Sequence, residues 1–194
     1  PPARVVGIAK AVAFDFTTDA LVDARLAPPK TRSTAVGAVL LGEARLMPVG
    51  FMEPFAYVRL VQSAFGGPGA VVLPPMDGPH IGSPWFDASF EVRMWGMAAA
   101  HGMSFCFGEL PDLAWGEDGA SLGLCVLLST PANAVRIMLG GEIVHVAGLP
   151  DGAQLRWQRW RAVRVVHSLA GGGLRVELDG VALVDSLPMP SFSA

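Results

Sequence analysis

A cluster of acidic residues in a loop-forming stretch is the first feature of this sequence that could do chemistry. Glu109, Asp112, Glu117 and Asp118 supply four carboxylates within ten residues, and the glycine and proline around them favour a loop. Calcium takes six to eight oxygen ligands, several of them from carboxylates. The four residues are therefore a candidate calcium site, and the alternative is a solvated acidic loop without a metal.

One lone tryptophan and one pair of tryptophans could contact a ligand. Trp115 lies within the acidic stretch, where it could stack on a sugar ring or anchor the loop in the core. Trp157 and Trp160 lie among several arginines. That cluster could bind an acidic partner or a glycan carboxylate. The alternative is one buried tryptophan, with arginine stems covering apolar surface.

The sequence lacks the constellations that catalysis requires. Glu177 and Asp179 are two residues apart and share a strand face, but Asp179 belongs to an Asp-Gly turn. No G-x-S-x-G elbow, dinucleotide fingerprint or P-loop occurs. We therefore expect a non-catalytic protein without a cofactor. No two histidines have the sequence spacing of metal ligands. The four histidines are His80, His101, His145 and His167.

Composition limits the partners that this chain can have. Charged residues make up only 16% of the 194 positions, against roughly 25% in a typical domain. Hydrophobic residues reach 52%, so we expect a folded chain and not a disordered one. The net charge of −3 and the absence of a basic stripe argue against nucleic acid. No apolar stretch reaches the roughly 20 residues that a membrane span needs.

Short runs of branched and aromatic residues, cut by glycine and proline, predict strands throughout the chain. The run from Phe86 to Met94 alternates apolar and polar residues, as a half-buried strand does. Asp179-Gly180 and Gly140-Gly141 each separate two such runs, which predicts two hairpins. The eleven predicted strands are Val36–Leu41, Tyr57–Val61, Ala70–Leu73, Trp85–Met94, Met103–Phe107, Leu122–Leu128, Val135–Leu139, Glu142–Val146, Trp160–His167, Leu174–Leu178 and Val181–Asp185.

This spacing predicts an all-β fold, an antiparallel β-sandwich. Helix signals are confined to a turn or two at Val22–Leu26 and Ala153–Trp160. We interpret residues 1–35 as an arm or linker and residues 36–194 as one domain. The chain begins at Pro1 and shows no signal peptide, so we expect a processed chain or a piece of a longer one.

The order of four motifs resembles the concanavalin A-like lectin and glucanase jelly roll, the fold of legume lectins and laminin G-like modules. The resemblance covers about Leu46 to Pro190. The sequence lacks the E-x-D-x-x-E pattern that the glucanases of this fold carry. The four motifs are Gly69–Pro75, Trp85–Met94 with its F-D-A-S-F, Ala100–Pro111 with its H-G-M-S-F, and Gly123–Asn133.

The resemblance implies a sugar site where these loops converge. His101 stands where legume-type members have a sugar-binding aspartate, and Ser129 replaces their first calcium aspartate. Gly102, Thr130 and Asn133 are retained. We expect the calcium site of the family to be lost, because Asn133 is followed by Ala-Val-Arg, with no acid. The alternatives are a turn histidine at His101 and a turn-former at Asn133. The candidate ligand set is His101, Gly102, Trp115 and Asn133.

The resemblance also places Cys106 and Cys125 on neighbouring strands, where a disulfide can form if their Cα atoms lie within about 7 Å. The alternative is two small buried hydrophobes. We expect a lectin-like, carbohydrate-binding module of an extracellular or cell-surface protein. The alternative is a structural, protein-interaction module of a larger assembly, with degenerate sugar and calcium sites.

Overall fold

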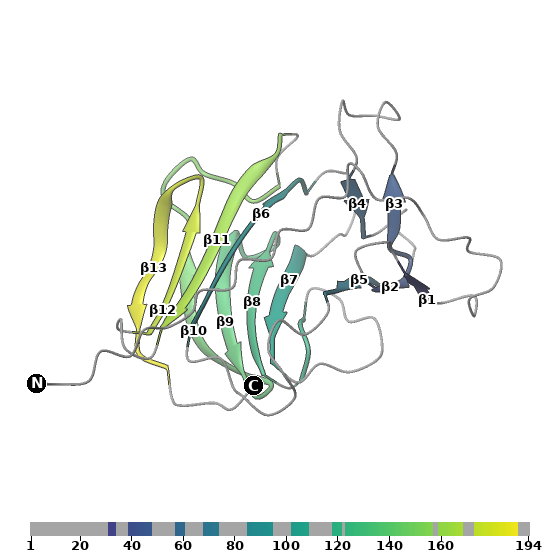
Figure 1. The fold of residues 1–194 in the computed structure, drawn as a ribbon. Coiled ribbons are helices and arrows are strands. Elements are labelled where there is room, and N and C mark those ends of the chain that lie inside the picture. The colour runs from purple at the N-terminus through teal and green to yellow at the C-terminus, as the bar shows by residue number, and fades with distance from the viewer. Residues whose placement is uncertain are drawn as a thin grey trace, which may run out of the picture.

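The computed structural model describes residues 31–33, 39–47, 57–60, 68–73, 85–94, 102–108, 118–121, 123–156, 159–168 and 173–189. These residues form thirteen strands and contain no helix. All strand pairs are antiparallel, and two four-stranded sheets pack face to face (Figure 1). The predicted all-β sandwich is therefore confirmed.

The first large sheet has the order β13-β12-β11-β6. Its strands are β6 (Trp85–Val92), β11 (Arg161–Ser168), β12 (Gly173–Leu178) and β13 (Val181–Leu187). Along β11 buried and exposed residues alternate, because one face of the sheet meets the core and the other meets solvent. The side of this sheet that points away from the core is therefore exposed to solvent.

The second large sheet has the order β10-β9-β8-β7. Its strands are β7 (Gly102–Phe107), β8 (Leu124–Ser129), β9 (Ala134–Leu139) and β10 (Glu142–Gly148). The central strand β8 is buried at five of its six positions, so both of its faces are covered. The edge strand β10 is mostly exposed.

The main core lies between these two sheets. Leu124 and Ile137 come from the second sheet, Val165 and Leu174 come from the first, and all four are fully buried. His167 is also buried, at 2% exposure, and its ring stacks on Phe86 with centroids 5.7 Å apart. Burial lowers the pKa of His167, because the apolar core disfavours the imidazolium.

Five shorter strands form two small sheets. They are β1 (Thr31–Ser33), β2 (Val39–Gly42), β3 (Arg45–Met47), β4 (Tyr57–Arg59) and β5 (Gly69–Val72). The first small sheet has the order β1-β2-β5, and the second pairs β3 with β4. The strand β1 belongs to the segment that we interpret as an arm.

Among the described residues, an aromatic contact joins the small β3–β4 sheet to the segment before β11. Tyr57 of β4 meets Trp160, which precedes β11, edge to face with ring centroids 5.7 Å apart. The guanidinium of Arg93 lies over the same indole, 5.3 Å from its centroid. Trp160 is therefore engaged by protein groups on two sides.

Both predicted hairpins are confirmed. Gly140 and Gly141 join β9 to β10 with φ of 58° and 88°, and Asp179 and Gly180 join β12 to β13 with φ of 51° and 78°. Two consecutive positive φ angles match the twist of the flanking strands. The two hairpins place β10 and β13 at the edges of their sheets.

All eleven predicted strands are present, with ends shifted by a few residues. The sequence analysis did not predict β1 and β3, which have three residues each. The described part of Ala153–Trp160 contains no helix, and Leu155 within it is a buried core residue.

Candidate functional site

The structure brings three of the lectin-like positions to one end of the second sheet. Gly102 begins β7 and lies directly opposite Ser129, the last residue of β8. Asn133 follows in the turn between β8 and β9, and its N–H donates to the carbonyl of Thr130. Gly102, Ser129 and Asn133 therefore lie at the same end of this sheet.

The side-chain amide of Asn133 is already occupied by the backbone. Its Nδ2 donates to the carbonyl of Ala153 at 2.7 Å, and its Oδ1 accepts from the N–H of Leu155 at 2.9 Å. Asn133 also has φ of 46°, a conformation that asparagine tolerates better than most residues. The residue therefore fixes the 153–155 segment against the β8–β9 turn, which buries Leu155.

The backbone conformation and the close packing at position 102 both favour glycine. Its φ is 140°, and a Cβ at this position would overlap the carbonyl of Leu128. The strand pair β7–β8 approaches too closely here for any side chain. The retained glycine is thus explained by packing.

Most other predicted site residues lie outside the described residues. These are His101 and Trp115 of the candidate ligand set and Glu109, Asp112 and Glu117 of the candidate calcium site. Only Asp118 of the acidic group is described, and it is exposed. Within the part of the chain that the structure describes, no three acidic, histidine or cysteine residues gather as a metal site.

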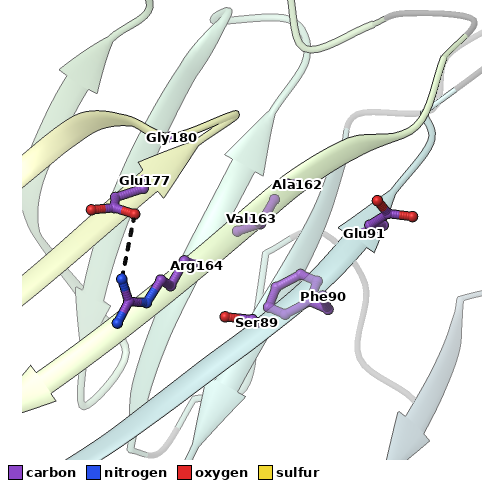
Figure 2. A pocket seen from close by; sticks show the side chains of 8 residues that line it. All are labelled: Ser89, Phe90, Glu91, Ala162, Val163, Arg164, Glu177 and Gly180. Carbon is purple, nitrogen blue, oxygen red and sulfur yellow. Dashed lines mark ion pairs between the residues drawn. The ribbon is translucent and has the colours of Figure 1, made fainter. Parts of the chain in front are cut away.

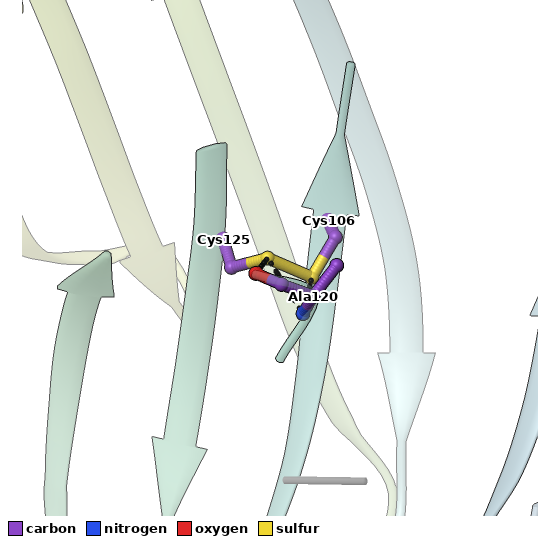
Figure 3. The surroundings of a disulfide bond; sticks show 3 residues. All are labelled: Cys106, Ala120 and Cys125. Carbon is purple, nitrogen blue, oxygen red and sulfur yellow. Dashed lines mark hydrogen bonds between the residues drawn. A yellow bond between two sulfur atoms is a disulfide. The ribbon is translucent and has the colours of Figure 1, made fainter. Parts of the chain in front are cut away.

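Cys106 and Cys125 form a disulfide between directly opposed residues of β7 and β8 (Figure 3). The S–S distance is 2.10 Å and the Cα atoms are 4.1 Å apart. The N–H of Ala120 lies 3.4 Å and 3.3 Å from the two sulfur atoms. Ala120, Cys125, Leu127 and Met138 make a second apolar cluster. It covers the face of the sheet that points away from the main core.

The solvent face of the first sheet carries a ladder of alternating charges, which we call the charge ladder. Asp87, Arg164, Glu177, Arg175 and Asp185 follow one another across the four strands. Arg164 donates to both carboxylate oxygens of Asp87, at 3.0 Å and 2.6 Å. Arg175 donates to Glu177 at 2.7 Å and to Asp185 at 2.8 Å.

The ladder shifts the pKa of three of its members. The hydrogen bond from Arg164 lowers the pKa of Asp87, although partial burial opposes this. The hydrogen bonds to Asp87 and Glu177 raise the pKa of Arg164 and Arg175, respectively. Opposite charges favour the ionised forms of both partners. The shifts of Asp87, Arg164 and Arg175 all favour the charged forms of these three residues.

A shallow hollow of about 360 Å³ lies beside this ladder (Figure 2). Its floor is the small side chain of Ala162, directly opposite Glu91. Ser89, Arg164 and Glu177 lie opposite one another on three adjacent strands and form one wall. Arg164 and Glu177 point toward each other there, with 3.9 Å between the nearest nitrogen and oxygen. The hollow offers hydroxyl, carboxylate and guanidinium groups that can hydrogen-bond a polar ligand.

Asp179 has a structural role in the hairpin turn. It accepts from Nε of Arg161 at 2.8 Å and from the N–H of Ala162 at 2.9 Å. Arg161, only 9% exposed, also donates to the carbonyl of Gln154 at 2.7 Å. Asp179 therefore neutralises a nearly buried cation, and Glu177 belongs to the charge ladder. The two carboxylates therefore have separate partners.

The edge strand β10 exposes three branched aliphatic side chains. Ile143 is 51% exposed, Val144 is 49% exposed and Val146 is 56% exposed. A bulge at Val144 interrupts the pairing of β10 with β9. Among the described strands, β9 alone pairs with β10. We call Glu142–Val146 the aliphatic edge.

Sequence reasoning missed both the hollow and the aliphatic edge. The hollow needs residues of β6, β11 and β12, and only the strand order brings these together. The aliphatic edge had a sequence signal, because Ile143 and Val144 are consecutive apolar residues directly after a two-glycine turn. That signal equally fits a buried strand, and only the position at the edge of the sheet distinguishes the two.

No protein-family model matches the chain, and no curated protein matches it either. The described residues include no helix that is both long and apolar enough to cross a membrane.

Proposed function

We propose that this chain is a non-catalytic β-sandwich module that binds protein through the aliphatic edge. The observation that carries the proposal is the half-exposed state of Ile143, Val144 and Val146 on an edge strand. Proteins normally protect such an edge with charges, a short strand or a covering segment. Exposed apolar groups that cluster on an edge mark a contact surface.

The state of Asn133 favours this function over a legume-type sugar site. Both polar atoms of its amide already bind the backbone of Ala153 and Leu155. A sugar would have to displace those bonds and leave the two backbone groups unpaired, which costs about 1–3 kcal/mol for each group. The Cys106–Cys125 disulfide fits an oxidising compartment, so the proposal includes an extracellular or cell-surface location.

The proposal requires the aliphatic edge to be accessible in the intact chain. The chain has two cysteines, and both are in the disulfide, so Val144→Cys introduces a unique thiol. We expect it to react with a maleimide as fast as Ala182→Cys, an exposed position on β13. The reaction is run in dilute protein. A Val144→Cys thiol that reacts more than about a hundredfold more slowly than the control would contradict the proposal, because another part of the chain then covers the edge.

Carbohydrate binding in the hollow is the second candidate function. It is favoured by the row of Ser89, Arg164 and Glu177 beside the apolar floor of Ala162, since sugar recognition combines hydroxyl hydrogen bonds with a small apolar contact. A glycan array with and without calcium tests it. Binding that is lost in Ala162→Arg, which fills the hollow, and kept in Asn133→Gly would place a sugar there. A negative array from folded protein would eliminate this candidate.

A further inference from the structure

Two copies of the aliphatic edge are chemically complementary when they are aligned antiparallel. Its first four residues are Glu142, Ile143, Val144 and His145, so a polar residue stands at each end and two aliphatic residues stand between them. The carboxylate at one end is an acceptor, and the imidazole at the other end can donate. In an isologous contact the same patch of two copies faces itself around a two-fold axis. The first residue of the patch in one copy then lies opposite the last residue in the other copy, so the two ends must attract each other.

The strand register places the two polar residues on one face. Glu142 lies opposite Leu139 of β9, and His145 lies opposite Ile137. Leu139 and Ile137 both contact the main core, and directly opposed residues share a sheet face. An axis perpendicular to the sheet preserves this face. It therefore sets Glu142 of one copy opposite His145 of the other.

The same axis pairs the aliphatic residues. When Glu142 opposes His145 of a second copy, Ile143 opposes Val144, and each pair occurs twice. Both side chains are about half exposed in the single chain, so they have apolar area left to bury. Glu142 and His145 make no ion pair within the described part of the chain, and the contact gives each of them a partner.

We infer that the aliphatic edge binds a second copy of this chain, antiparallel and around a two-fold axis between Ile143 and Val144. This inference rests on the proposed function and names its partner. The bulge at Val144 interrupts the regular edge, so the contact is confined to residues Glu142–His145 and is made largely by their side chains. We expect a dissociation constant of about 10 µM, since so short a contact falls below the standard interface size.

Sedimentation velocity of the full chain, from about 1 µM to about 500 µM, tests the inference. We expect a reversible monomer–dimer equilibrium. Replacing Ile143 and Val144 together by serine should weaken the dimer at least tenfold. Val181→Ser is the matched control, because Val181 is also an exposed aliphatic residue on an edge strand but belongs to β13. It should leave the equilibrium unchanged.

A charge exchange tests the pairing itself. Glu142→Lys and His145→Glu should each weaken the dimer about tenfold, and the double variant should recover most of the loss, because it reverses both partners of each pair. A wild-type protein that stays monomeric, or a dimer that Val181→Ser dissociates, would overturn the inference. So would a double variant that is weaker than both single variants.

The maleimide experiment separates this failure from failure of the proposed function. A monomer whose Val144→Cys thiol reacts freely removes the second copy as the partner and leaves the edge available for a different protein. A monomer whose thiol is protected removes both proposals.

Discussion

The amide of Asn133 offers the sharpest prediction about stability, because it decides between a structural role and a ligand role. Asn133→Gly keeps the positive φ of 46° without strain and removes both side-chain hydrogen bonds. Each bond contributes about 1 kcal/mol net, and the unpaired N–H of Leu155 adds to the loss. We expect a decrease in the free energy of unfolding of about 2–3 kcal/mol.

Two further variants separate the sources of that loss. Asn133→Ala should cost about 1 kcal/mol more than Asn133→Gly, since alanine pays a steric penalty in the left-handed region. Ala132→Gly introduces a glycine at an exposed neighbouring position of the same turn. It should cost only about 0.5–1 kcal/mol from backbone entropy.

Urea unfolding followed by tryptophan fluorescence measures all three variants. For a chain of this size the loss in Asn133→Gly should lower the midpoint by about 1 M. An Asn133→Gly variant whose free energy of unfolding lay within about 0.5 kcal/mol of the wild-type value would refute this prediction. That result would mean that the amide does not hold the 153–155 segment and is available to a ligand.

Three other predictions concern the disulfide, the buried histidine and the β12–β13 turn. Replacing Cys106 and Cys125 together by alanine should cost about 3 kcal/mol, the value for a closed loop of this size, measured by urea unfolding under non-reducing conditions. The pKa of His167 is lower in the folded chain than in the unfolded chain, where it is about 6.5, so below about pH 6.5 the unfolded chain binds more protons. The free energy of unfolding should therefore decrease as the pH falls from about 6.5 toward the pKa of the folded state. Thermal unfolding of His167→Phe should lack this pH dependence. Asp179→Gly keeps the positive φ but leaves a nearly buried arginine without its carboxylate, which should cost about 2–3 kcal/mol, whereas Asp87→Ala on the exposed charge ladder should be close to neutral. Equal losses in both aspartate variants would contradict the importance of burial.

The sandwich could be predicted from the sequence because its signals are local. The alternation from Phe86 to Met94 specifies one buried face, and the structure buries or half-buries the predicted apolar residues there. The pairs Gly140-Gly141 and Asp179-Gly180 specify two-residue hairpins through their positive φ angles. Strand order across the sheets is not local, so nothing in the sequence placed Ser89 beside Arg164.

The candidate site was harder to predict because polar side chains have several uses. Asn133 was identified as a ligand candidate or a turn-former, and only its two hydrogen bonds show that it fixes a distant segment. Glu177 and Asp179 are close in sequence, yet Arg175 binds one and Arg161 binds the other. The pairing of a carboxylate depends on neighbours from other strands, which residue spacing does not reveal.

Amide hydrogen exchange across β10 tests the central claim most directly, because it reports whether the free side of this strand is covered. In dilute protein, the β10 amides that point away from β9 should exchange at nearly the rate of an unstructured peptide, while those bonded to β9 are protected. At high protein concentration, the exchange of the outward amides between Glu142 and Val146 should slow. Strong protection of the outward amides in the dilute protein would contradict the account, because the chain itself would then cover the proposed contact surface.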